Sequence, residues 1–365
     1  MGHIQRRGPG RYKARYRDPA NTERSKTFAR RVDAERWLTQ QESAKNRGEW
    51  TDPRLARTCF GDWEPSVSAG RVDLRESTQS RDASLMRNLV LPHFQDHPLG
   101  SVLPADIQAW IANLIASEYS PSTVRKAFQL AAGVFSSAVD SGLISRSPCR
   151  NIRLPREIRT EMRFLDPSEI ADLSAAIGPR FRTLTVTAAY SGLRWGELAA
   201  LRLEDVNLLR RQITVTRTLS EVRGHIRFTE PKTKAAWRTV AIPPTVAQQI
   251  GQHIGRYPAR DNLVFSSDQG GPLRRTNFRQ RQWLPAVRAS VGEPCRFHDL
   301  RHSHVSLLIN AGEHPKTIAS RLGHTSVRTV LDVYGHLFEG LDEAAADRLE
   351  AVFLHHLAAS PRPGA

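Results

Sequence analysis

The chain opens with polar and apolar positions that alternate, and it then changes to a helical period. Residues 8–28 read as strands with one buried face, because aromatic and small side chains alternate there with three basic residues, Lys13, Arg15 and Arg17. A helix is expected next, with its N-cap at Asp33 and its apolar face at Ala34, Trp37 and Leu38. Residues 1–56 are therefore predicted to form a small sheet with one helix, whose basic residues either bind a ligand or form a solvated face.

Residues 57–150 show helical periods almost throughout. The clearest helix begins at Ser120 and Pro121, a favourable pair for the N-cap and the first turn. Its apolar stripe predicts a core-facing helix and consists of Val124, Phe128, Ala131, Phe135, Ala138 and Val139. Arg125 and Lys126 lie off this stripe, where they are free to meet phosphate.

Residues 163–358 begin a new alternation of helix and strand. A helix is expected to start at Pro167, and another to run through Leu184–Leu201. One small antiparallel sheet is predicted from three strand-like runs, residues 212–218, 225–229 and 238–242. Helices then return, and a last amphipathic helix is predicted over residues 341–357.

Two stretches are predicted to lie outside these domains. Residues 151–162 are basic and poor in core residues, so they are expected to be a linker, either laid along a polyanion or simply solvated. Residues 359–365 are rich in proline and small residues and are expected to be disordered. The pattern as a whole predicts a multidomain, mainly α protein with small antiparallel β-sheets.

Charge then points to the class of partner. Lys and Arg number 53 against 37 Asp and Glu, which gives a formal charge of +16, and the excess is concentrated in the first fifty residues. A basic protein that must find and hold a polyanion gains affinity from counterion release. Nucleic acid is therefore the leading partner, and a ribosomal or merely basic protein is the alternative.

Cysteine usage and the N-terminal residues bear on location. Cys59, Cys149 and Cys295 are far apart and show neither metal-ligand nor redox spacing, so they are expected to be reduced. The N-terminal residues are not those of a signal peptide. No stretch approaches the ~20 apolar residues of a membrane span, so no membrane partner is expected and the protein is predicted to be cytoplasmic.

Five short segments in the second half carry most of the candidate chemistry. They are residues 191–198, 231–234, 298–302, 322–324 and 334–336. Together they supply two arginines, a lysine, several histidines and a tyrosine. This set suits attack on a phosphodiester by a tyrosine hydroxyl, because guanidinium groups bind the non-bridging oxygens of a phosphoryl transition state.

Arg194 follows a glycine-containing turn and precedes Glu197 by three residues. It is therefore expected at the start or bend of a helix, with its guanidinium open to a ligand and oriented by Glu197. Alone, such a pair is usually a surface ion pair. Within this set of segments it favours an anion site.

His298 and Arg301 lie at i and i+3, so both can point from one helix face at one phosphate. A zinc site is the alternative, because His302 follows His298 by four residues and His304 is close by. Zinc hydrolases of that spacing place a glutamate beside the first histidine, whereas this chain has an aspartate there. No metal is expected, and His302 and His304 are assigned to packing or capping.

The order and surroundings of these segments resemble those of the tyrosine recombinase (phage integrase) family, in the form of a prophage integrase of an actinobacterial type. The resemblance implies that Tyr334, ten residues after His324, is the nucleophile and forms a 3′-phosphotyrosyl link without ATP, metal or another cofactor. Arg194 and Arg301 would hold the phosphate, with His298 as proton carrier or hydrogen-bond donor and His324 in support.

The lysine of the family's active site is expected on the turn between two strands. Lys232 matches it better than Lys234, counted from Pro231 to Arg238, although the register is uncertain. A lysine at this place can protonate the leaving 5′-oxygen, a form of general-acid help worth about 10²–10⁴-fold. A lysine at a hairpin tip is otherwise most often solvated.

The resemblance also implies an architecture and partners. An arm-type DNA-binding domain (1–56) would use Lys13, Arg15 and Arg17. A helical core-binding, SAM-like domain (57–150) would use Arg125 and Lys126, and a catalytic domain would follow (163–358). Double-stranded DNA attachment sites and a homo-tetramer on DNA are implied, together with a host DNA-bending protein, a directionality factor and a place at the nucleoid of a bacterial host.

Two other functions stay open on sequence grounds. One is a non-catalytic DNA-binding protein of the same fold, against which the intact residue set argues. The other is an enzyme like a type IB topoisomerase, which shares the tyrosine and the cations. The N-terminal domain favours an integrase, and formation of joined products from two duplexes would separate these possibilities.

Overall fold

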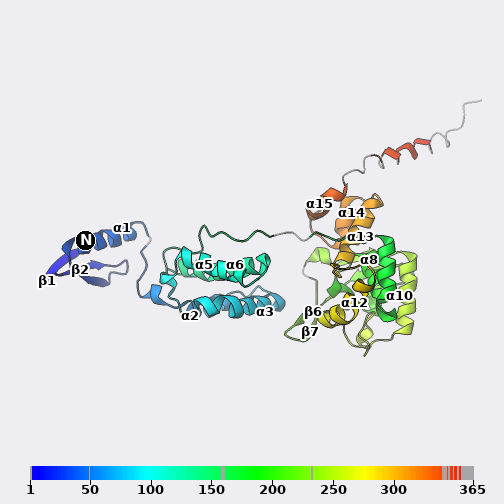
Figure 1. The fold of residues 1–365 in the computed structure, drawn as a ribbon, viewed down its shortest axis with the longest axis horizontal. Coiled ribbons are helices and arrows are strands. Elements are labelled where there is room, and N and C mark those ends of the chain that lie inside the picture. The colour runs from blue at the N-terminus through cyan, green and yellow to red at the C-terminus, as the bar shows by residue number, and fades with distance from the viewer. Residues whose placement is uncertain are drawn as a thin grey trace, which may run out of the picture. The chain divides into compact units, whose positions relative to one another are not determined.

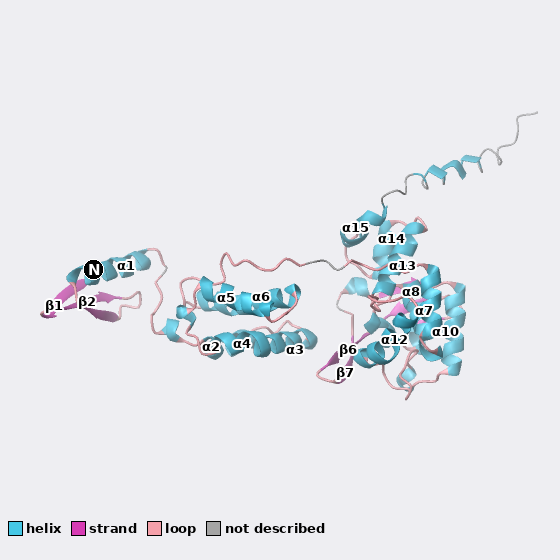
Figure 2. Cartoon of the chain, in the orientation of Figure 1, coloured by secondary structure: helices cyan, strands magenta, loops and turns pink. Residues whose placement is uncertain are grey.

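The computed structural model describes residues 2–48, 50–157, 161–231 and 233–338 and, further on, residues 343, 346–347, 349–351 and 353–354. Contacts divide the chain into two compact units, Met1–Arg159 and Thr160–Ala365. Figures 1 and 2 show that helices dominate, with short strands near the N-terminus and in the second unit. The predicted fold class, mainly α with small antiparallel sheets, is confirmed.

The N-terminal residues fold into a three-stranded antiparallel sheet and one helix. The strands lie in the order β1 (His3–Gly8), β2 (Arg11–Arg17), β3 (Glu23–Phe28). The helix that follows them is α1 (Arg31–Asn46). Ala14 and Tyr16 of β2 are buried with Ala34 and Leu38 of α1, and the Tyr16 ring meets that of Trp37 edge-on at 5.3 Å. The alternation predicted for β2 is therefore confirmed.

The predicted N-cap of α1 at Asp33 is wrong. The helix begins at Arg31 with Arg30 as its N-cap, so Asp33 lies inside the first turn. Its Oδ2 accepts a hydrogen bond from Arg30 Nε at 2.9 Å. Because an acidic residue stabilises a helix start both as a cap and in the first turn, the pattern locates the helix but not its first residue.

A bundle of helices forms the next part of the first unit. Its elements are η1 (Leu55–Arg57), α2 (Phe60–Ala69), α3 (Glu76–Leu85), the π-helical η2 (Met86–Val90), α4 (Leu91–Phe94), η3 (Leu99–Ser101), α5 (Pro104–Ala116) and α6 (Pro121–Asp140). As predicted, α6 is capped by Ser120, whose Oγ accepts a hydrogen bond from the backbone N–H of Thr123 at 3.3 Å. Its stripe faces the core, where the rings of Phe60, Phe94 and Phe135 pack 5.2 to 6.1 Å apart.

The segment after this bundle is attached to it. Ile152 and Leu154 pack on the bundle core, and Arg125 of α6 donates from Nε to the carbonyl of Pro155 at 2.8 Å. The first part of the predicted linker is therefore packed, not solvated. Residues 158–160 of that linker lie outside the described residues.

The second unit is built from helices with two small antiparallel sheets. One sheet has the order β4 (Val206–Asn207), β5 (Gln212–Val215), β8 (Arg238–Ala241), and the other pairs β6 (Thr218–Val222) with β7 (His225–Thr229). The helical elements before residue 260 are α7 (Pro167–Ala176), α8 (Pro179–Ser191), α9 (Trp195–Ala199), η4 (Leu203–Asp205), η5 (Lys234–Ala236) and α10 (Pro244–Arg256). Those after it are η6 (Arg260–Asn262), α11 (Arg275–Phe278), η7 (Arg279–Trp283), α12 (Leu284–Ala289), α13 (Asp299–Asn310), α14 (Pro315–Leu322), α15 (Arg328–Tyr334) and η8 (Gly335–Phe338).

Two predictions for this unit are corrected. The helix expected through Leu184–Leu201 is interrupted, because Gly192 takes a left-handed conformation (φ 67°) that ends α8. The strand expected over 212–218 is divided between β5 and β6, so the predicted single sheet is two sheets. The start of α7 at Pro167 is as predicted, with Asp166 as its cap.

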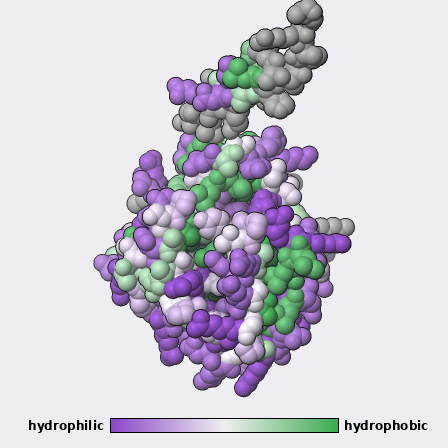
Figure 3. All heavy atoms as spheres, turned by 90° about the vertical axis from the view of Figure 1, so that its right-hand side faces the viewer, coloured by the Kyte–Doolittle hydropathy of each residue, from purple (hydrophilic) through white to green (hydrophobic). Residues whose placement is uncertain are grey.

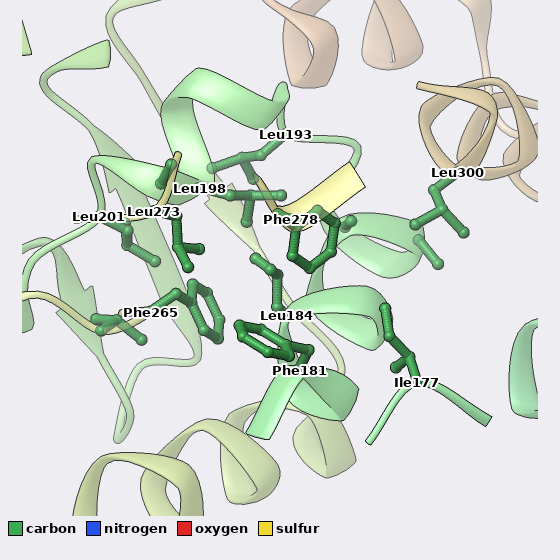
Figure 4. Packing of buried hydrophobic residues seen from close by; sticks show 14 of the residues in the cluster. Ile177, Phe181, Leu184, Leu193, Leu198, Leu201, Phe265, Leu273, Phe278 and Leu300 are labelled. Atoms are coloured by element: carbon green, nitrogen blue, oxygen red, sulfur yellow. The ribbon is translucent and has the colours of Figure 1, made fainter. Parts of the chain in front are cut away.

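The main core of the second unit surrounds α8, which packs against α7, α10 and α13. Figure 4 shows Phe181 and Leu184 of α8 close to Phe278, with Leu193 and Leu198 from the following segment. A separate apolar cluster joins α13, α14 and α15 through Val305, Ile318, Leu322, Val330 and Tyr334. The two clusters hold the segments that carry the candidate chemistry.

Polar side chains cover most of the surface in view (Figure 3), and the described part of the predicted C-terminal stripe is exposed. Figure 3 shows a mostly hydrophilic face with a few hydrophobic patches. Of the stripe predicted over 341–357, Leu349 and Phe353 are exposed, while Leu341, Ala345 and Leu357 lie outside the described residues, as does the predicted disordered tail. Among the described helices, none is long and apolar enough to cross a membrane.

Candidate active site

The first segment of the site is formed by the break between α8 and α9. Gly192 ends α8, and a Cβ at this position would lie 2.5 Å from Cδ2 of His304. A glycine is needed here because of both the left-handed φ and this close approach. Arg194 then becomes the N-cap of α9, and its side chain is 40% exposed.

Glu197 stands one turn further on and is almost fully buried. Its carboxylate accepts hydrogen bonds from the backbone N–H of Arg194 (2.9 Å), from Arg194 Nη1 (2.9 Å) and from Arg238 Nη2 (2.8 Å). Burial alone would raise the pKa of this carboxyl, but the hydrogen bond and charge of Arg238 and the contacts with Arg194 hold it below its usual value. The predicted pairing of Glu197 with Arg194 is present, and Arg238 is a second partner that the sequence did not reveal.

Arg301 of α13 is buried between the ends of two other helices. Nη1 donates to the carbonyl of Gly192 at 2.5 Å, after α8, and Nη2 donates to the carbonyl of Leu322 at 2.7 Å, at the end of α14. Unpaired carbonyls at helix C-termini are good acceptors for a cation. Desolvation, with the nearby charge of Arg194, lowers the pKa of Arg301 to about 9.

His324 follows α14 directly. Gly323 caps that helix with a left-handed φ of 67°, and the next residue, His324, places Nε2 3.2 Å from Arg301 Nη2. Desolvation and the charges of Arg301 and Arg194 lower the pKa of His324 to about 4. The ring is therefore neutral near pH 7 and can hydrogen-bond an anion without adding charge.

Tyr334 ends α15 and is 3% exposed. Its hydroxyl lies 2.7 Å from Nδ1 of His302, while its ring belongs to the apolar cluster of α13 and α14. Burial raises the pKa of Tyr334, and the charge of Arg301 partly offsets that rise. His302, which the sequence assigned to packing or capping, is thus the partner of the candidate nucleophile.

His298 is the N-cap of α13 and lies at the wall of a cavity of about 1040 Å³. Arg194 lines the same cavity, together with three further cations, Arg275, Arg279 and Arg296. Desolvation, with the neighbouring His302 and Arg301, lowers the pKa of His298 to about 4. The cavity also has one carboxylate, Glu221, in its lining, so four guanidinium groups outnumber it beside one neutral ring. Such an excess of positive charge suits phosphate groups.

The other predicted residues are placed as follows. Lys232 lies outside the described residues, and the side chain of Lys234 is not described, so the assignment of the lysine stays a prediction. Arg15 and Arg17 of β2 bind Glu23 and Asn21 respectively, and they alternate with the residues that face α1. The other predicted DNA contacts are Lys13, which is half-buried on the same strand, Arg125, which is held by Pro155, and Lys126, which is exposed.

The histidines of the zinc alternative have other partners. His302 faces Tyr334, and His304 is buried with Nδ1 3.0 Å from the carbonyl of Ala189. Among the residues that the structure describes, no three His, Cys, Asp or Glu side chains are grouped so as to hold a metal ion.

In the second unit, arginines, histidines and one tyrosine meet from distant segments. This is the set of residues expected of a tyrosine recombinase. Two family models agree with this: the phage integrase family matches residues 163–340, and the phage integrase N-terminal domain matches residues 1–47. The chain belongs to the phage integrase family.

Individual relatives are similar over almost their whole length. The integrase of Mycobacterium phage L5 is 29% identical over 371 residues, which cover 95% of this chain and 96% of the relative. The ICEBs1 integrase of Bacillus subtilis is 27% identical over 350 residues, covering 91% and 94%. The resemblance to tyrosine recombinases is confirmed by these matches.

Two solved structures share the fold. The Tn1549 transposon integrase in complex with a circular intermediate DNA has a TM-score of 0.70 at 20% identity, covering 80% of this chain and 99% of that one. A lambda integrase dimer bound to a COC′ core site has a TM-score of 0.61 at 17% identity, covering 93% and 95%.

Proposed function

We propose that the protein is a site-specific integrase that cleaves and rejoins DNA at attachment sites with Tyr334 as its nucleophile. One observation carries this proposal. Arg301 contacts Gly192 on one side and His324 on the other, and its neighbour His302 contacts Tyr334. Four segments that are far apart in the chain thus bring two arginines, two neutral histidines and a tyrosine to one place, which is the inventory of a phosphoryl-transfer site.

The cleavage step uses the buried pair of Tyr334 and His302. The phenol oxygen attacks the scissile phosphorus, so an O–P bond to tyrosine forms and the bond from phosphorus to the 5′-oxygen breaks. The phenolic proton passes to Nδ1 of His302, which lies 2.7 Å away and whose pKa is lowered mainly by desolvation, so that the ring is free to accept it. The ester retains the bond energy, and its attack by a 5′-hydroxyl rejoins DNA without ATP.

The cations stabilise the charge that develops on the phosphate. Arg194 is held by Glu197 and Arg301 by two carbonyls, so both keep fixed positions while the phosphate changes geometry. Preorganised donors of this kind contribute about 3–4 kcal/mol each to a transition state. His298 and His324 add neutral hydrogen bonds, and Lys232 protonates the leaving 5′-oxygen.

DNA is held over a larger surface than this site. The formal charge of +16, with Arg275 and Arg279 along the cavity, supports phosphate contacts in the second unit. Lys13, Arg15 and Arg17 contact DNA from the N-terminal sheet, and Arg125 and Lys126 contact it from the bundle. In this proposal three domains, at 1–56, 57–150 and 163–358, bind the DNA together.

Exchange between two duplexes requires four protomers, because each protomer supplies one tyrosine and four strands are cut. A homo-tetramer passes through a Holliday junction in our proposal, and a lambda integrase tetramer bound to a Holliday junction shows that a protein of this fold can form such an assembly. The protein works in the cytoplasm of a bacterial host, at the nucleoid, with a host DNA-bending protein and a directionality factor.

Covalent trapping tests the proposal. A nicked duplex that carries the attachment core loses the short strand after cleavage, so the protein–DNA adduct accumulates and is seen on a denaturing gel. The wild type is expected to form this adduct, and Tyr334→Phe is expected to bind the same DNA without forming it, because the phenyl ring lacks the attacking oxygen.

The other outcomes have definite meanings. An adduct with Tyr334→Phe would show that another residue is the nucleophile. Binding without an adduct by the wild type would favour a non-catalytic DNA-binding protein. If the protein forms the adduct and relaxes a supercoiled plasmid but never joins two duplexes, an enzyme like a type IB topoisomerase would be favoured.

A further inference from the structure

Arg238, at the start of β8, makes four hydrogen bonds to protein groups near the site. Its side chain is 6% exposed. Nη1 and Nη2 both donate to the carboxylate of Glu197, at 3.2 and 2.8 Å. Nε donates to the carbonyl of Arg321 at 2.6 Å, and Nη1 also donates to the carbonyl of Ala236 at 3.2 Å.

One of these acceptors lies in a segment that carries the candidate chemistry, and the other two lie next to such segments. Glu197 orients Arg194, Arg321 precedes Gly323 and His324, and Ala236 belongs to the turn that follows Lys232 and includes Lys234. All three nitrogens of the guanidinium are therefore occupied by protein groups. Four of its five N–H groups donate to protein acceptors, whereas Arg194 lines the cavity.

The packing around Gly323 draws the same segments together. A Cβ at this glycine would lie 3.0 Å from the carbonyl of Ala235 and 3.1 Å from Nη1 of Arg238. The end of α14 is thus pressed against the turn over residues 234–236, and Arg238 fills the junction. Among the described residues, Arg238 therefore joins the end of this turn to the end of α14.

We propose that Arg238 is a positioning residue that fixes the lysine-bearing turn against Glu197 and the segment of His324. The leaving 5′-oxygen can then be protonated as Tyr334 attacks the phosphorus. This inference rests on the proposed function, in which a lysine of that turn protonates the 5′-oxygen. Lysine at position 238 would not replace arginine, because a single ammonium cannot reproduce a planar fork directed at three acceptors.

The test compares two leaving groups. Wild type, Arg238→Met and Arg238→Lys are assayed for single-turnover cleavage of a nicked duplex whose scissile phosphate carries either an ordinary 5′-bridging oxygen or a 5′-bridging sulfur. A thiol ionises near pH 8.5, far below an alcohol, so the sulfur leaves without a proton donor. With oxygen, Arg238→Met is expected to cleave at least about 100-fold more slowly than wild type, the lower range of general-acid help.

With sulfur, the difference between Arg238→Met and wild type is expected to shrink by about tenfold or more, because the proton donor is then not required. Arg238→Lys is expected to show the same dependence on the leaving group, with a smaller loss of cleavage rate. It replaces Arg238→Met in the test if Arg238→Met does not fold. DNA affinity is expected to stay near that of wild type, because the Arg238 side chain is 6% exposed and is bound by protein acceptors.

A matched control is available in the same unit. Arg163 also binds one carboxylate, that of Glu169, and two carbonyls, those of Val291 and Gly292. Arg163→Met is expected to cleave both substrates at rates close to those of wild type once its folded fraction is taken into account.

The outcomes separate this inference from the function beneath it. If wild type forms no adduct with either substrate, the proposed function fails. If wild type cleaves and Arg238→Met loses the same factor with oxygen and sulfur, or loses no more than Arg163→Met, then Arg238 does not position the proton donor.

Discussion

The helical bundle of the first unit and the second unit are both mainly α-helical, but they bury different kinds of side chain. The core of the bundle is entirely apolar and centres on residues such as Phe60, Phe94 and Phe135. The second unit buries Glu197, Arg301 and several other polar groups besides its apolar core. Among the residues described in the first unit, the buried polar side chain is Asp18, which lies outside the bundle.

The apolar core of the bundle and the buried charges of the second unit contribute differently to stability and to function. An apolar core tolerates change as long as volume is kept, and its cost of truncation follows the size of the cavity. A buried ion pair contributes little net stability, yet breaking it by removing one partner is expensive. The second unit therefore uses its buried charges to fix geometry, which a phosphoryl-transfer site needs and a scaffold does not.

The largest effect is expected from breaking the bundle core. Phe135→Ala is expected to lower the free energy of unfolding of the bundle by about 4 kcal/mol, because a large ring is lost and its cavity only partly closes. Hydrogen exchange followed peptide by peptide measures this loss in α2, α4 and α6. Equal loss of protection in peptides of the second unit would contradict the separation of the two cores.

A slightly smaller effect is expected from breaking the buried ion pair of the second unit. Glu197→Gln leaves the buried guanidinium of Arg238 without a counter-charge, so the free energy of unfolding of this unit is expected to fall by about 3 kcal/mol. The same exchange measurement reports it. Glu204→Gln is the control, because Glu204 pairs with Arg217 while 55% exposed, and such pairs contribute at most about 1 kcal/mol.

The smallest expected effect is a dependence of the stability of the second unit on pH. His253 is 4% exposed, and desolvation lowers its pKa to about 4. Below pH 6.5 the unfolded chain takes up this proton before the folded one, so stability present above that pH is lost as pH falls toward 4. Between pH 6.5 and 5, the free energy of unfolding of the second unit is expected to fall by about 2 kcal/mol more in the wild type than in His253→Phe. This value follows because a difference of one pKa unit corresponds to about 1.4 kcal/mol.

Thermal or chemical denaturation of both proteins across this range checks the prediction. The substituted ring would remain in contact with Tyr257 and Phe265, whose centroids lie 5.0 and 5.2 Å from that of His253. An identical pH dependence for wild type and variant would show that His253 is protonated as easily in the folded protein as in the unfolded chain.

Much of the fold was predictable because it depends on local patterns. The Ser120 cap and the stripe of α6 are encoded within twenty residues, and the alternation of β2 within six. Asp33 and the break at Gly192 were misjudged for one reason: local preference places an element but leaves its ends to tertiary contacts. Gly192 has its conformation fixed partly by His304, which lies more than a hundred residues away.

The candidate site divides in the same way. Arg194, His298, Arg301, His324 and Tyr334 could be proposed from the sequence because each lies in a short, distinctive segment. Arg238 and His302 were missed, because their roles come from contacts with Glu197 and Tyr334 that span 41 and 32 residues. No spacing rule marks such partners, and in an arginine-rich chain one further arginine carries no signal of its own.

The burial of Tyr334 has a consequence for the protein's encounters with DNA. Its hydroxyl is paired with His302 and its ring is enclosed by the apolar cluster of α13 and α14. Under the proposed mechanism, a phosphate at the protein surface therefore meets cations before it meets the nucleophile. In the same mechanism, contacts with DNA that do not rearrange this region leave the strands uncut, because the apolar packing of α13, α14 and α15 covers the tyrosine.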